Sequence, residues 1–270
     1  MALENTVHPT ESQTRHTATG CGVLIINADD WGRDRETTNR IFECVSQKRV
    51  SSASGMVFME DSARAAAIAL DQSVDIGLHL NFTTPFSAPN TPVQVLEHQQ
   101  RVAAYLLRRR MNQAVFHPGL IQSFEYSVTT QLEEYQRLYG IPPSRIDGHH
   151  HMHLSMNILL GKLLPAGTRV RRNFSFQSGQ KGRVNRMYRQ WVDRSLARRH
   201  QLTDFFFPLI PLDSSNRLKQ IFSLSQNFAV EVETHPIAQN EYAFLTGEEF
   251  LRMSSTFPLA NRYKLKADGN

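Results

Sequence analysis

The sequence is poor in cysteine, with only Cys21 and Cys44 in 270 residues. A secreted disulfide scaffold needs more cysteines at more regular spacing, so that class is excluded. We expect both thiols to be reduced, as in a cytoplasm, and Cys44 to be a core residue because it lies in an apolar helical pattern. Long apolar runs are also missing, since none approaches the roughly 18–20 residues of a membrane-spanning helix. The sequence therefore predicts a cytoplasmic globular protein without a transmembrane segment.

The first twenty residues, MALENTVHPTESQTRHTATG, are polar and contain proline and glycine. They include no apolar stretch of the kind that forms the centre of a secretory signal. We therefore expect residues 1–21 to be a flexible leader and residues 22–270 to form one folded domain. The chain is 40% hydrophobic and 20% charged, which is an ordinary composition for such a domain.

Positive charge is in excess, with a formal net charge of +5, and it is clustered. Such clusters can indicate an anionic partner, namely nucleic acid, a phosphorylated substrate or a membrane surface. They also fit a solvated helix face, which is the more ordinary interpretation. No nucleic-acid-binding motif accompanies the charge, so we expect no nucleic-acid partner. The clusters are Arg108–Arg110, then Arg169, Arg171 and Arg172, and then KGRVNRMYRQWVDRSLARRH over 181–200, a candidate basic helix.

Short apolar runs alternate with longer amphipathic segments along the chain. This order predicts parallel strand–helix–strand units. About seven parallel strands in a single α/β domain predict a (β/α)-barrel-like fold or a strongly twisted sheet. The expected strands are VLIINA (23–28), SGMVFM (54–59), DIGLHLNF (75–82), SRID (144–147), TRVRRN (168–173), DFFFPL (204–209) and AVEVETH (229–235), and the expected helices cover 35–49, 61–72, 94–110, 124–140 and 245–255.

Titratable side chains follow four of these strands directly. Asp29 and Asp30 come after the first strand, His79 follows DIGL, His149 follows SRIDG, and His235 follows AVEVET. Taken singly, an Asp-Asp pair before Trp-Gly fits a turn, and a histidine in LHL fits a satisfied core residue. Their shared position is harder to explain in that way, because the carboxyl ends of parallel strands meet on one face.

The residue types at these strand ends suit a mononuclear metal site. Two neutral imidazoles and one carboxylate form a set that leaves positions open for water and substrate. Such a metal lowers the pKa of water and polarises a carbonyl group. Neighbouring residues on a strand point in different directions, so Asp29 and Asp30 need not both bind metal. One of them can be a ligand while the other acts as a general base.

Four motifs occur in order along the chain: NADDWG (27–32), GLHLNFT (77–83), DGHHHMH (147–153) and EVETHP (231–236). With them the chain resembles the YdjC-like (ChbG/HpnK) family of carbohydrate deacetylases. The resemblance covers residues 23 to about 255. It implies a (β/α)-barrel-like fold, one divalent metal ion (Mg²⁺ or Zn²⁺) and hydrolysis of an N-acetyl group from an amino sugar, with release of acetate. It also implies that two copies can associate as a homodimer.

The resemblance assigns roles to the residues of these motifs. Asp30, His79 and His149 would bind the metal, Asp29 would be the general base, and His235 would be the general acid or would stabilise the transition state. His150 is expected to matter least in its run. Other motif residues would orient the ligands or line the substrate site, namely Asn27, Trp31, Asp147, His151 and His153.

The sequence also departs from the family pattern in its loops. Trp31 stands where phenylalanine is usual, TTPFSAP replaces a glycine after the second motif, and Pro208 stands where glycine is expected. Two other interpretations stay open. A metal-dependent phosphoesterase fits the basic segments but should gather ligands for two or three metals. A carbohydrate-binding homologue without catalysis should have lost the base or a ligand, and here all of these residues are present.

Overall fold

The computed structural model describes residues 22–175, 182–212, 215–257, 259–260 and 263. The predicted leader and Cys21 lie outside these residues. The described chain forms one sheet of seven parallel strands in the order β5-β4-β3-β2-β1-β7-β6, so the prediction of about seven parallel strands is confirmed. The strands are β1 (Val23–Trp31), β2 (Ser52–Gly55), β3 (Ile76–Leu80), β4 (Arg145–Gly148), β5 (Arg169–Val170), β6 (Phe205–Pro208) and β7 (Ala229–Thr234).

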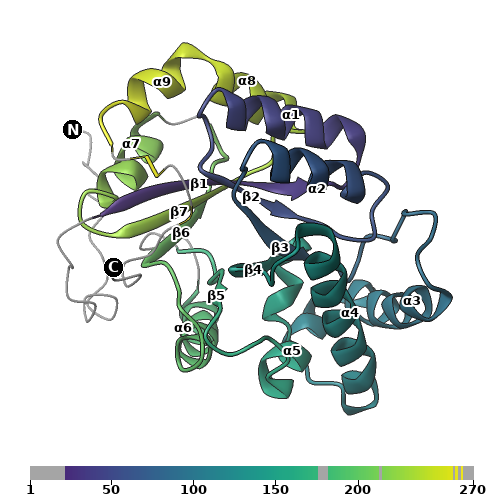
Figure 1. Cartoon of the computed structure of the whole chain (residues 1–270). Coiled ribbons are helices and arrows are strands. Elements are labelled where there is room, and N and C mark those ends of the chain that lie inside the picture. Colours follow the sequence, from purple (N-terminus) through teal and green to yellow (C-terminus); the bar gives the residue numbers. More distant parts are fainter. Residues whose placement is uncertain (1–21, 176–181, 213–214, 258, 261–262, 264–270) are drawn as a thin grey trace.

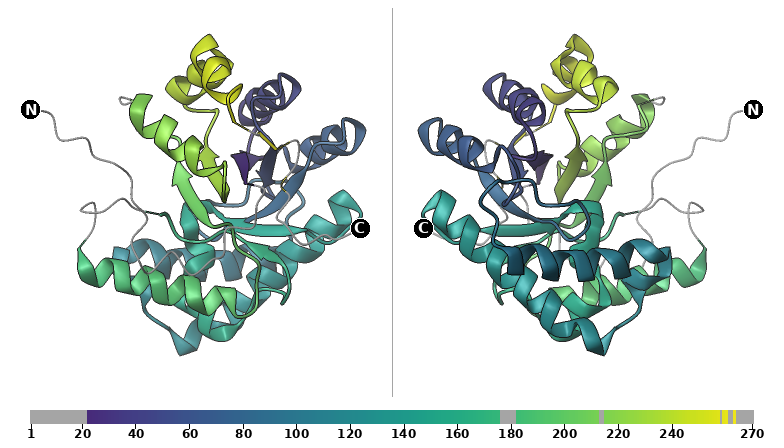
Figure 2. Two further views of the ribbon diagram at one scale, coloured as in Figure 1. Left: turned by 90° about the vertical axis from the view of Figure 1, so that its left-hand side faces the viewer. Right: turned by 90° about the vertical axis from the view of Figure 1, so that its right-hand side faces the viewer.

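Helices cover the outside of the curled sheet (Figures 1 and 2). Among those that the structure describes, none combines the length and the apolarity needed to cross a bilayer. They are α1 (Arg35–Ser46), α2 (Ser62–Asp71), α3 (Val93–Arg108), α4 (Ile121–Tyr139), α5 (Met156–Gly161), α6 (Arg183–Ala197), α7 (Ser215–Leu224), α8 (Gln239–Thr246) and α9 (Glu248–Ser254), with 3-10 turns η1 (Arg110–Ala114), η2 (Pro118–Leu120) and η3 (His149–Leu154).

The sheet curls into an open barrel with β5 and β6 at its two ends. The segment after β5 partly closes this opening, because the Ser175 backbone N–H donates to the Phe206 carbonyl at 2.7 Å. Pro208 is the last residue of β6, inside the predicted strand DFFFPL (204–209), so it does not lie in a substrate-lining loop. An edge strand tolerates proline because the missing N–H interrupts no central ladder.

The two faces of the curled sheet differ in chemistry because side chains alternate along each strand. The face toward the helices is apolar and forms the core, with residues such as Leu24, Ile26, Leu78 and Val232. The other face encloses a buried polar interior. Its residues are Asn27, Asp29, Ser52, Ser54, His79, Arg145, Asp147, Arg171, Glu231 and Glu233.

Three predicted elements differ from the structure. The second strand is Ser52–Gly55, whereas most of the predicted SGMVFM run forms a buried irregular segment after it. The apolar character of that run reflects burial rather than strand pairing. The predicted strand 168–173 pairs over only Arg169–Val170. The last helix is broken into α8 and α9 at Gly247, whose extended backbone starts a new helix.

Candidate active site

The carboxyl ends of β1, β3 and β4 bring three predicted ligands together. Asp30, His79 and His149 are all buried, and they offer ligand atoms that lie within 4.8 Å of one another. Asp30 Oδ1 is 2.9 Å from His149 Nδ1 and 3.4 Å from His79 Nε2. The structure therefore places these three side chains as the sequence predicts, at one point of the barrel rim.

A bulge in β1 turns Asp30 toward the two histidines. Ala28 pairs with Ala53 and Trp31 with Gly55, so β1 has one more residue than β2 across this stretch. Asp30 takes a φ of 74°, a left-handed conformation that aspartate tolerates better than most residues. Arg33 Nη1 then donates to Asp30 Oδ2 at 2.7 Å and leaves Oδ1 facing the histidines. Because of the bulge, Asp29 and Asp30 both face the site.

The three side chains fit a divalent metal ion. His79 Nδ1 lies 2.8 Å from Asp147 Oδ1, a carboxylate contact that directs Nε2 of the same ring toward Asp30. His79 Nε2 and Asp30 Oδ1 are buried, and among the described residues neither makes a hydrogen bond of normal geometry, although Asp30 Oδ1 lies close to both histidines. Buried polar atoms are rarely left unpaired, and a bound cation would satisfy both. Two imidazoles and a carboxylate also suit the ligand preferences of such a metal.

Asp29 is fixed by Arg171, which the sequence did not indicate. Arg171 Nη1 and Nη2 donate to the two oxygens of Asp29 at 2.6 and 2.8 Å, and Asn27 Nδ2 donates at 2.8 Å. Burial opposes the charge on Asp29, but Arg171 and then His79 hold the pKa of this carboxyl well below its usual range. Asp29 is therefore ionised and held in one orientation, as a proton acceptor must be.

Arg171 is the centre of a wider buried network. It also lies 2.9 Å from Asp147 Oδ2, donates through Nε to Glu231 at 2.7 Å, and sits 4.9 Å from the centre of the Phe206 ring. Both interpretations of its basic cluster, an anionic partner or a solvated face, are wrong for this residue. Arg172 beside it pairs with Asp193 of α6 at 2.8 Å.

Glu233 and His235 lie beside Asp29 in the same site. Ligand atoms of Asp29, Glu233 and His235 lie within 4.8 Å of one another, so His235 lies beside the candidate base. Burial and the neighbouring negative charge of Asp29 raise the pKa of Glu233 well above its usual range. Glu233 is not among the site residues predicted from the sequence; the alternation of valine and glutamate in AVEVET, the pattern of a strand with one polar face, is the signal that could have indicated it.

The other three histidines of the run lie around the three candidate ligands in different environments. His151 Nε2 lies 3.6 Å from Glu233 Oε1, and the ring packs edge-on against Phe174. His153 is fully buried and its Nε2 lies 3.0 Å from the Arg171 carbonyl. His150 lies beside the site, with Nδ1 3.0 Å from Thr83 Oγ1. His150 and His151 both have positive φ, so this turn is unusual in its backbone as well as in its sequence.

Two of the remaining predicted residues contact the site and one does not. Asn27 binds Asp29 and accepts from Ser52, while Asp147 binds His79 and accepts from Ser54 at 2.6 Å. Trp31 is 0% exposed and packs in the hydrophobic core between the sheet and the helices. The structure thus places Trp31 with the core residues and not in the polar cluster.

A cavity of about 640 Å³ opens beside this cluster, between η1, η3 and α6. His150 and His151, next to the candidate ligand His149 in the chain, line it, and Phe174, Tyr188 and Arg189 are among its other lining residues. A volume of this size suits a small organic ligand. The basic helix α6 therefore contributes one wall of a cavity next to the site.

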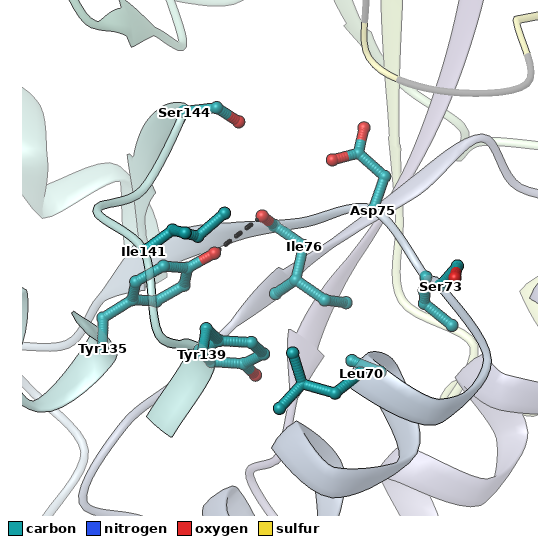
Figure 3. Close-up of a pocket in the computed structure, with 10 residues that line it drawn as sticks. Leu70, Ser73, Asp75, Ile76, Tyr135, Tyr139, Ile141 and Ser144 are labelled. Atoms are coloured by element: carbon teal, nitrogen blue, oxygen red, sulfur yellow. Dashed lines mark hydrogen bonds between the residues drawn. The ribbon is translucent and has the colours of Figure 1, made fainter. Parts of the chain in front are cut away.

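A smaller hollow of about 310 Å³ lies away from this cluster, between α2 and α4 (Figure 3). Leu70, Tyr139 and Ile141 line it, and Tyr135 donates its hydroxyl to the Ile76 carbonyl at 2.8 Å. Ile76 begins β3, whereas His79 lies near its carboxyl end. This hollow is therefore at the other end of the strand from the candidate ligands.

Known proteins resemble the chain in sequence and in fold. A chitooligosaccharide deacetylase of Serratia marcescens is 31% identical over 141 residues, 50% of this chain and 52% of that protein. The corresponding protein of Proteus mirabilis is 27% identical over 136 residues, again 50% of this chain and 52% of its own length. The chain thus spans about half the length of the curated relatives it matches.

A solved structure from Enterococcus faecalis V583, described provisionally as a cellobiose-phosphate cleavage protein, has the same fold. The TM-score is 0.63 at 19% identity, with 89% of this chain and 97% of that chain covered. The sequence model of the family described as YdjC-like protein matches residues 23–255. That match covers most of the chain, including all the motifs described above, and the chain therefore belongs to the YdjC-like protein family.

Proposed function

We propose that this protein is a metal-dependent carbohydrate deacetylase that removes the acetyl group from an N-acetylated amino sugar and releases acetate. The observation that carries this proposal is a carboxylate, Asp29, held ionised by Arg171 beside three side chains that fit one divalent metal. Hydrolysis of an amide needs both an activated water and a polarised carbonyl. The names of the two chitooligosaccharide deacetylases support the same reaction and the same class of substrate.

Asp30, His79 and His149 would hold the metal, which when bound would polarise the acetyl carbonyl and acidify water. Asp29 accepts the proton of the attacking water while Arg171 keeps the carboxylate in place. The water oxygen joins the carbonyl carbon, the carbon–nitrogen bond breaks, and His235 donates a proton to the departing amine. Acid–base steps of this kind typically contribute about 10²–10⁴-fold each.

The low pKa of Asp29 fits a temporary proton carrier rather than a strong base. A carboxylate that Arg171 holds so firmly has low proton affinity, so it passes an acquired proton on readily. Glu233 and His235 lie next to it and offer a route toward the leaving group. Burial and the neighbouring Asp29 raise the pKa of Glu233, which favours its protonated form.

The cavity beside His150 and His151 would take the part of the substrate beyond the reacting sugar. Its wall combines the Phe174 and Tyr188 rings with Arg110 and Arg189. Aromatic rings suit sugar faces or an apolar group, and arginines suit a phosphate. Oligosaccharides, lipid-linked sugars and nucleotide-linked sugars are therefore the substrates to compare. The two imidazoles favour zinc over magnesium as the metal.

One observation favours a second function, a phosphoesterase with two metals. Asp29, Glu233 and His235 also gather within 4.8 Å, next to the first group. However, Arg171 occupies both oxygens of Asp29, and a guanidinium beside a second cation would repel it. We therefore favour one metal and acetate release.

Acetate release from a panel of N-acetylated sugars, with protein stripped of metal and reloaded with zinc or magnesium, tests the proposal. The deacetylase predicts acetate and one metal per chain. Phosphate release from phosphorylated sugars with two metals per chain would favour the phosphoesterase instead.

A further inference from the structure

Arg171 holds Asp29 with its two terminal nitrogens and reaches in the other direction with Nε. Nε donates to Glu231 Oε1 at 2.7 Å, and Glu231 is 1% exposed on β7. A guanidinium is planar and rigid, so the partner of Nε helps to set the orientation of the whole fork. The position of Glu231 therefore bears on how Arg171 presents its donors to Asp29.

The second oxygen of Glu231 is held from outside the four motifs. Tyr263 donates its hydroxyl to Glu231 Oε2 at 2.8 Å, and this tyrosine is 6% exposed. Burial and the adjacent Glu231 raise the pKa of Tyr263 well above its usual value, so the hydroxyl keeps the proton that it donates. Loss of this donor would leave a buried carboxylate oxygen unsatisfied, which is costly.

Tyr263 is itself anchored at the far end of the barrel. Its backbone N–H donates to Asp75 Oδ2 at 2.7 Å, and the Arg145 guanidinium sits 4.9 Å from the centre of its ring. Arg145 also binds Asp75 at 3.0 Å. Asp75 precedes β3 and Arg145 begins β4, so this anchor is at the opposite strand ends from the candidate metal ligands.

The segment that carries Tyr263 is also tied to β1. Leu259 forms a parallel bridge with Leu24, and the Ala260 backbone N–H donates to the Leu24 carbonyl at 2.8 Å. A line of buried hydrogen bonds thus runs from Tyr263 through Glu231 and Arg171 to Asp29. Tyr263 and Asp29, the two ends of this line, are each held by a further hydrogen bond, Tyr263 to Asp75 and Asp29 to Asn27.

We propose that Tyr263 is a positioning residue for Asp29 and acts through Glu231 and Arg171. The inference rests on the proposed function, in which Asp29 accepts the proton of water. A tyrosine that merely fills the end of the barrel needs its ring, whereas this role needs its hydroxyl. The substitution Tyr263→Phe separates the two, because it keeps the ring and removes one oxygen atom.

The matched control is Tyr242→Phe. Tyr242 on α8 also donates its hydroxyl to a glutamate, Glu43 on α1, but this pair lies on the outside of the molecule and contacts none of the site residues described above. With an acetylated sugar that the wild-type protein hydrolyses, Tyr263→Phe should lower kcat about 10-fold. KM and metal content should stay within about twofold of wild type, since substrate and metal are bound by other residues. Tyr242→Phe should leave all three unchanged.

A double-mutant cycle tests whether the effect passes through Glu231. Glu231→Gln removes the charge opposite Arg171, and adding Tyr263→Phe to it should lower kcat little further. Losses that multiply, or a kcat of Tyr263→Phe within twofold of wild type, would overturn the proposal. If Tyr263→Phe does not fold, the kcat of Glu231→Gln is the deciding measurement. A wild-type kcat in Glu231→Gln would overturn the proposal.

A readout that needs no turnover separates this inference from the proposed function. The side-chain Nε–H signal of Arg171, followed by nitrogen-15 NMR and assigned by its loss in Arg171→Lys, should shift in Tyr263→Phe and not in Tyr242→Phe. An unshifted signal overturns the link from Tyr263 to Arg171. If the signal shifts in Tyr263→Phe but the wild-type protein releases no acetate, the link from Tyr263 to Arg171 stands. The deacetylase function and the positioning role of Tyr263 in it are then both contradicted.

Discussion

Arg171 and Asp29 form a buried bidentate ion pair, with nitrogen–oxygen distances of 2.6 and 2.8 Å, although they are 142 positions apart in the sequence. None of the four sequence motifs, the histidine run included, contains Arg171. The pair determines where the candidate base points and keeps it ionised, so the site depends on the segment after β5 as much as on the motifs.

Arg171→Lys should lower kcat about 10–100-fold while the metal stays bound, because lysine keeps the charge but cannot hold both oxygens of Asp29 in one plane. Steady-state kinetics and metal analysis check this. Arg172→Lys is the control, since Arg172 pairs with Asp193 outside the site and its change should leave kcat nearly intact. A wild-type kcat in Arg171→Lys would refute the positioning role of the ion pair.

Asp29→Asn should lower kcat about 10²–10⁴-fold, because the amide cannot accept the proton of water. Asp29 is not among the three proposed ligands, so metal content should not change. Asp193→Asn, at a carboxylate that binds Arg172 away from the site, controls for the general effect of the substitution. Near-native turnover in Asp29→Asn would show that another group is the base.

His79→Ala and His149→Ala should each lose the bound metal, since each removes one of three protein ligands. Metal content after dialysis, together with calorimetric titration of the stripped protein, measures the loss. The control is His98→Ala on α3, where the ring contacts Ser123. Full occupancy after loss of either ring would exclude that histidine as a ligand.

Acid should destabilise the fold in part through His153, because burial lowers the pKa of this histidine from 6.5 to about 4. Above pH 6.5 the ring is neutral in both the folded and the unfolded chain. Between pH 6.5 and 4 only the unfolded chain takes up the proton, so stability falls as the pH falls, by about 3 kcal/mol in total.

His153→Gln removes this titration and keeps a side-chain nitrogen near the Arg171 carbonyl. The free energy of unfolding of wild type minus that of the variant should therefore shrink by about 2–3 kcal/mol between pH 7 and pH 4.5. Denaturant unfolding at the two pH values measures it. A difference that does not change with pH would show that His153 is protonated as readily in the folded protein.

Much of the fold and the convergence of the candidate site residues could be predicted from the sequence. Alternating apolar and amphipathic segments gave the parallel strands in order, and residues that directly follow strands must gather at one rim. That rule brings Asp29, Asp30, His79, His149 and His235 together, and the family resemblance then proposes Asp30, His79 and His149 as the ligands. The SGMVFM run was predicted as a strand but mostly forms a buried irregular segment. Apolar residues buried in a loop have the same sequence pattern as residues buried in a strand, so the pattern cannot separate the two.

The partners of the motif residues could not be predicted in the same way. Arg171 follows a paired segment of two residues, too short for its inward direction to be evident, and its arginine neighbours suggested a surface cluster. The bulge that turns Asp30 depends on how β1 pairs with β2. The contact of Tyr263 with Glu231 joins residues 32 positions apart in the chain, which no local pattern indicates.

The most direct test of the central claim measures acetate released from N-acetylated sugars by the wild-type protein, stripped of metal and reloaded with one divalent ion per chain. The proposed site predicts acetate release that requires the ion and that Asp29→Asn abolishes while the ion stays bound. Absence of acetate release from every sugar of the panel, at full metal occupancy, would contradict it.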